Sequence, residues 1–141
     1  MSASKVKEII GEDIFDNYYV FCVEREPVDK CLSHYSMLRH PPYHNKKHHN
    51  LTFDEYIERK NFPIDTKKYT DADGKLLVNK ILKYEHLVED INEVAKLLGF
   101  KINLTAKAKT GFREDIKVSD IQREVIYGAF SKSLKYTKYK V

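Results

Sequence analysis

The chain has 141 residues, of which 42% are hydrophobic and 33% charged, and its formal net charge is +4. This length is sufficient for one domain that buries roughly two-thirds of its unfolded surface, so we expect a single domain over residues 1–141. The hydrophobic runs are too short to span a bilayer and no signal-peptide pattern follows Met1, which excludes a membrane-spanning segment in this chain and makes a cytoplasmic location the default expectation.

The spacing of apolar residues predicts an α/β chain. The expected elements are a helix over 4–15, a strand over 18–24, a helix over 27–39, a polar loop over 40–50, a short helix from Thr52, a loop over 61–74, a strand over 76–82, a helix over 87–98 and a last helix from Ser119 to Leu134. Strands that alternate with helices predict a parallel sheet flanked by helices. A sheet of only two strands cannot bury both of its faces well. This indicates a fold that is incomplete at its N-terminus.

Local signals mark several helix ends. Pro27 suits the first turn of a helix, Gly99 suits the position after a helix end, and the Ser119–Gln122 segment has the spacing of a capping box. Glu85 precedes the helix over 87–98, and we interpret it as a structural residue that caps this helix.

An anion site is predicted where the first strand ends. Arg25 follows the apolar run 18–23, and the helix that begins at Pro27 directs N–H groups and the positive end of its dipole to the same place. Arg25 adds a planar, permanently charged group, and Ser33 adds a hydroxyl further along the helix.

This segment resembles the 3′-phosphate-binding motif of PAPS-dependent sulfotransferases, in which a strand ends in Arg-x-Pro and a Ser follows eight residues after the Arg. The corresponding residues here are Arg25, Pro27 and Ser33, followed by the pair His34–Tyr35. The resemblance continues in the same order through residues 52–57, 73–78, 84–87 and 97–99. It therefore covers most of the chain and resembles the C-terminal part of a carbohydrate-type sulfotransferase.

The resemblance implies a partial P-loop-kinase-like α/β fold that binds the 3′-phosphoadenosine part of PAPS, with PAP as the product. Arg25 and Ser33 would hold the 3′-phosphate, and Lys109 and Arg113 would cover it from a late basic loop that contains glycine. The acceptor would be a hydroxyl group of a carbohydrate or a similar molecule.

The chain lacks one part of the family pattern. The family's 5′-phosphosulfate loop and its usual catalytic base lie upstream of the Arg motif, and no such segment is found here. We therefore expect the isolated chain to transfer no sulfate, and its catalytic residues stay unknown. A preceding segment would also permit a Golgi or membrane location.

Two further interpretations remain open. The chain is also compatible with a non-catalytic assembly module that self-associates or pairs with a missing N-terminal segment. Residues 101–141 carry a net charge of +6 against −2 for residues 1–100, which suits a polyanion. DNA or RNA is not an expected partner, because the tyrosines form no aromatic and basic stripe.

Histidines and cysteines suggest no metal site. Five of the six histidines lie between His34 and His49, but the neighbouring sequence supplies no cysteine or carboxylate cluster to complete a metal site around His44 and His48. Cys22 and Cys31 form no CxxC pattern, and we expect both to be free thiols.

Overall fold

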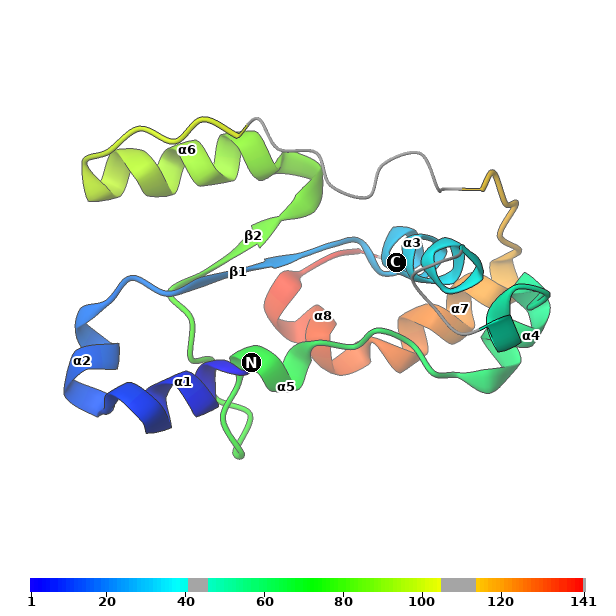
Figure 1. Cartoon of the computed structure of the whole chain (residues 1–141), viewed down its shortest axis with the longest axis horizontal. Coiled ribbons are helices and arrows are strands. Elements are labelled where there is room, and N and C mark those ends of the chain that lie inside the picture. The colour runs from blue at the N-terminus through cyan, green and yellow to red at the C-terminus, as the bar shows by residue number, and fades with distance from the viewer. Residues whose placement is uncertain (41–45, 105–113, 141) are drawn as a thin grey trace. The chain divides into compact units, whose positions relative to one another are not determined.

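The computed structural model describes residues 1–40, 46–104 and 114–140 (Figure 1). Within these ranges the chain is a mixed α/β protein with a small two-stranded parallel sheet and flanking helices. It forms two compact units, each assembled from separated segments of the chain. Unit 1 comprises residues 1–25, 64–103 and 132–140, and unit 2 comprises the described residues within 26–63 and 104–131.

Unit 1 contains both strands. Its elements are α1 (Ala3–Ile10), α2 (Glu12–Asn17), β1 (Phe21–Glu24), α5 (Thr66–Tyr69), β2 (Lys80–Lys83), the short 3-10 helix η2 (Tyr84–His86), α6 (Leu87–Leu98) and all but the first residue of α8 (Ser131–Thr137). The two strands pair in parallel, with Phe21 opposite Lys80 and Glu24 opposite Lys83. The prediction of a parallel sheet is therefore confirmed, although both strands are shorter than expected.

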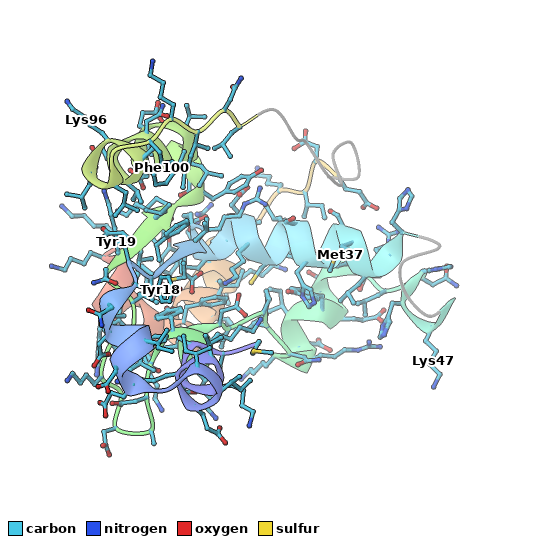
Figure 2. The ribbon with its side chains drawn as sticks, turned by 60° about the vertical axis from the view of Figure 1, so that its left-hand side comes forward. Tyr18, Tyr19, Met37, Lys47, Lys96 and Phe100 are labelled. Carbon is cyan, nitrogen blue, oxygen red and sulfur yellow. The ribbon has the colours of Figure 1, made fainter. Side chains whose placement is uncertain are left out.

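A buried apolar cluster joins the sheet of unit 1 to its longest helix. Leu82 of β2 packs against Ile91 and Val94, which face it from α6. Tyr19, labelled in Figure 2, packs against the same cluster. The predicted apolar face of α6 is buried at Ile91, Val94 and Ala95, whereas Leu98 at its end is exposed. Gly99 ends the helix with φ 78°, in the left-handed region that favours glycine.

Unit 2 is helical among the residues that the structure describes. Its elements are α3 (Pro27–Arg39), the 3-10 helix η1 (Lys46–His48), α4 (Phe53–Arg59) and α7 (Asp120–Ala129). Its core is rich in aromatic rings, with Tyr35 5.3 Å from Phe53 and 5.6 Å from Tyr56, measured between ring centroids. Edge-to-face contacts of this kind stabilise the packing beyond simple burial.

Some predicted boundaries are wrong. Gly11 divides the expected first helix into α1 and α2, and Phe130 separates α7 from α8. The short helix α5 lies inside the loop predicted over 61–74. No helix in the described ranges is long and apolar enough to cross a membrane.

Candidate functional site

The carboxyl ends of β1 and β2 meet at the same edge of the sheet because the strands are parallel (Figure 1). The ladder ends at the pair Glu24 and Lys83. Arg25 directly follows β1 and Tyr84 directly follows β2, and their side chains are in contact. Ligands of open parallel sheets commonly bind outside the carboxyl ends of the strands, so this edge is the candidate site.

Arg25 stacks on Tyr84. The guanidinium carbon Cζ lies 4.2 Å from the centroid of the Tyr84 ring, and the tyrosine side chain is half-exposed. A cation over an aromatic face is attracted by the ring quadrupole. The stack also fixes the plane of the guanidinium, whose hydrogen-bond donors lie around its edge rather than on its face.

Tyr139, beyond the end of α8, contacts both strand ends. Its hydroxyl oxygen lies 2.6 Å from Oε2 of Glu85 and 3.2 Å from the backbone carbonyl oxygen of Glu24, and these two acceptors share its one proton. The Nζ atom of Lys83 lies 4.8 Å from the centroid of the Tyr139 ring. The Glu85 carboxylate accepts from Tyr139, and the N-cap residue of α6 is His86, whose side chain makes no capping hydrogen bond, so the capping role of Glu85 stays a prediction.

Glu26 changes the anion site that the sequence predicts at the start of α3. Its two carboxylate oxygens accept from the backbone N–H groups of Val28, at 3.1 Å, and Asp29, at 2.8 Å. The Tyr127 hydroxyl donates to the same carboxylate. These N–H groups are therefore satisfied by the protein's own side chain, and a phosphate at this place would rely on side-chain donors.

The pKa of the Tyr127 hydroxyl is raised at the start of α3. Burial, and after it the hydrogen bond to Glu26, raises the pKa of Tyr127 to about 12. The phenol therefore stays protonated and remains a donor throughout the physiological range.

Ser33 lies on α3 in unit 2 and is half-buried. On the same helix, Nδ1 of His34 lies 2.9 Å from the Tyr56 hydroxyl. Cys31, on the buried side of the helix, is fully enclosed, and burial raises the pKa of its thiol to about 12. Cys31 is therefore a packed neutral thiol, and both cysteines of the chain are free, as the sequence predicts.

A buried polar cluster lies behind the sheet edge in unit 1. Glu24 is only 3% exposed, and the Tyr69 hydroxyl faces both Glu24 and Thr66. Burial, and after it the Glu24 charge, raises the pKa of Tyr69. Sequence reasoning assigned no role to Glu24 or Tyr139, although a charged residue at the end of an apolar strand is a signal that could have drawn attention to Glu24.

The residues predicted to bind the 3′-phosphate do not all belong to the same unit. Arg25 belongs to unit 1 and Ser33 to unit 2. Lys109 and Arg113 lie outside the described residues, as does His44. Among the residues that the structure does describe, no group of three histidine, cysteine or acidic side chains is placed to hold a metal ion.

The arrangement is suited to binding an anionic ligand with an aromatic part. Arg25 supplies a charged, oriented donor, and the adjoining Tyr84 supplies an aromatic surface.

The chain is similar to an uncharacterized protein from Archaeoglobus fulgidus, with 34% identity over 120 residues. The matched region covers 78% of this chain and 92% of the archaeal protein. The chain therefore belongs to the same family as that protein. No protein-family model matches the chain, and no solved structure matches it.

Proposed function

We propose that this chain binds the 3′-phosphoadenosine part of PAPS as a sulfotransferase-family domain with a partial P-loop-kinase-like fold. The observation that carries the proposal is Arg25, which follows β1 directly and stacks on Tyr84 at the carboxyl edge of a parallel sheet. The ordered resemblance to PAPS-dependent sulfotransferases gives the ligand its identity. A carbohydrate hydroxyl is the corresponding acceptor.

In this proposal, Arg25 pairs with the 3′-phosphate. A guanidinium donates two parallel N–H bonds to two phosphate oxygens, and such charge-assisted pairs are stronger than neutral hydrogen bonds. The resemblance to sulfotransferases adds Ser33, Lys109 and Arg113 to the residues expected to hold this phosphate. The Glu26 carboxylate at the start of α3 makes these side-chain donors more important, because it already accepts from the Val28 and Asp29 N–H groups.

The position of the phosphate on the ribose gives the sharpest test. We expect adenosine 3′,5′-bisphosphate to bind more tightly than adenosine 2′,5′-bisphosphate, which has the same charge, and more tightly than AMP. Isothermal titration calorimetry at a fixed salt concentration measures all three, since phosphate binding depends strongly on salt. Equal affinity for the two bisphosphates would reduce the binding to general attraction between opposite charges.

We expect Arg25→Ala to weaken PAP binding by about 1.5–3 kcal/mol, the usual contribution of a hydrogen bond to a charged group. Arg59→Ala is the matched control, because Arg59 is an exposed arginine at the end of α4 and its loss removes the same charge. The control should change the affinity little. A similar loss in both variants would contradict a specific role for Arg25.

A further inference from the structure

The Tyr139 hydroxyl contacts the chain neighbours of both stacked residues. Glu24, whose carbonyl oxygen lies 3.2 Å from this hydroxyl, directly precedes Arg25. Glu85, whose Oε2 atom lies 2.6 Å from it, directly follows Tyr84. A single hydroxyl from the C-terminal segment therefore links the backbone of the residue before Arg25 to the side chain of the residue after Tyr84.

We propose that Tyr139 is a positioning residue, which sets the orientation of Arg25 on Tyr84 and thereby the affinity for a 3′-phosphorylated nucleotide. The effect of Tyr139 on nucleotide affinity rests on the function proposed above. Its effect on the orientation of Arg25 does not, and this orientation can be measured without any ligand.

The physical reason lies in where the strand ladder stops. Backbone pairing ends at Glu24 and Lys83, so the sheet does not itself fix the next residue of either strand. An arginine side chain has many rotamers, and ordering it costs conformational entropy. A hydrogen-bonded link between the two strand ends holds the ring and the guanidinium at a constant separation, which reduces the ordering that a ligand would have to impose.

The ring of Tyr139 has a separate contact. Lys83 Nζ lies 4.8 Å from its centroid, an attraction that depends on the aromatic face rather than on the hydroxyl. Tyr139→Phe therefore removes the link between the strand ends and leaves the ring in place. This makes the substitution specific for the proposed role.

Tyr136, which lies in α8 three residues before Tyr139, provides a matched control. Its hydroxyl also donates to a backbone carbonyl of unit 1, that of Gly74, which lies in a turn away from the two strand ends. Tyr136→Phe thus removes one tyrosine hydroxyl and one hydrogen bond of the same type. Any general effect of such a loss on unit 1 should be seen in both variants.

The first readout is the ¹⁵N NMR signal of the Arg25 Nε–H group, assigned by its disappearance in Arg25→Lys. Because the guanidinium lies over the Tyr84 ring, the ring current displaces this signal from the position of an ordinary arginine. We expect Tyr139→Phe to move the signal toward that ordinary position and Tyr136→Phe to leave it unchanged. An unchanged signal in Tyr139→Phe would overturn the proposal, whatever the nucleotide affinity.

The second readout is calorimetric titration with PAP. We expect Tyr139→Phe to weaken binding by roughly three- to tenfold, the effect of one hydrogen bond, while Tyr136→Phe binds like the wild type. A displaced Arg25 signal with unchanged PAP affinity would also overturn the role in binding. If the wild type does not bind PAP, the proposed function fails, and the NMR signal alone decides whether Tyr139 positions Arg25.

Glu85→Ala gives an independent route to the same answer if Tyr139→Phe does not fold. It removes the acceptor at 2.6 Å and keeps the tyrosine intact. The same displacement of the Arg25 signal is expected. A wild-type signal in this variant would contradict the link through Glu85.

Discussion

At the scale of a single residue, Glu26 determines the electrostatics at the N-terminus of α3. A free helix N-terminus attracts anions, but here two of its N–H groups bind the Glu26 carboxylate, which also accepts from Tyr127. The sequence indicated an anion site by the position of Pro27, and the structure shows an anion of the protein itself at that place. Arg25, one residue earlier, therefore becomes the main charged donor of the candidate site.

The Tyr127–Glu26 contact predicts a pH dependence of stability. The pKa of Tyr127 rises from an ordinary value of 10 to about 12 in the folded protein. The folded state therefore retains a proton that the unfolded state has lost, so this contribution to stability is complete below pH 10 and disappears as the pH rises through 12. We expect the wild type to lose about 2–3 kcal/mol relative to Tyr127→Phe across this window.

Urea denaturation at a series of pH values measures this difference. Tyr18→Phe is the control, since Tyr18 is 63% exposed and the substitution removes the same hydroxyl from the surface. A constant difference between the wild type and Tyr127→Phe from pH 9 to 12 would show that the hydroxyl is not protected as the structure indicates.

Gly11 shows how one backbone conformation can divide an element. The apolar spacing of residues 4–15 predicts one helix, but Gly11 adopts φ 90° and ψ 153° and separates α1 from α2. Residues with a side chain rarely adopt this conformation, because Cβ collides with the backbone. Periodicity identifies an apolar face but does not specify a break at which the face changes direction.

Two glycine substitutions should have opposite effects on the free energy of unfolding. Gly11→Ala should destabilise the protein by about 1–3 kcal/mol, because the positive φ is strained for alanine even though no neighbouring atom obstructs the new methyl group. Gly128→Ala, inside α7 and also unobstructed, should stabilise it by about 0.5–1 kcal/mol through helix propensity. Urea denaturation followed by circular dichroism measures both, and a destabilising effect of equal size at the two sites would contradict the conformational explanation.

At the scale of the whole molecule, segments that are distant in the sequence build each unit. Unit 1 joins the N-terminal segment, the middle of the chain and the C-terminal residues 132–140. Leu82, which is fully buried, lies at the centre of its apolar cluster. Each unit is therefore built from separated segments of the same chain. The single domain expected over residues 1–141 stays a prediction.

We expect Leu82→Ala to lower the free energy of unfolding by about 2–5 kcal/mol, since it removes buried methyl groups and leaves a cavity between β2 and α6. Val88→Ala is the control, because Val88 lies on the exposed side of α6 and its loss should change stability by less than about 0.5 kcal/mol. Chemical denaturation compares the two variants. A loss under about 1 kcal/mol in Leu82→Ala would mean that this cluster is not the core of unit 1.

The sequence by itself determined the elements with strong local signals. α3 spans the predicted residues 27–39 and α6 the predicted residues 87–98, and Pro27 marks the start of the first as Gly99 marks the end of the second. The capping box at Ser119 is also confirmed, with Gln122 completing it. The parallel pairing followed from strands separated by helices, and the sequence indicated Arg25 by its position after an apolar run.

Tertiary structure alone decided what surrounds Arg25. Tyr139 lies 114 residues along the chain from Arg25, and no local pattern connects a C-terminal tyrosine with the ends of two strands. Glu85 appeared suited to a helix cap by its sequence position, which gives no sign that its carboxylate accepts from the Tyr139 hydroxyl. Helix ends are specified by neighbouring residues, whereas the surroundings of a side chain depend on packing between distant segments, which is why the first could be predicted and the second could not.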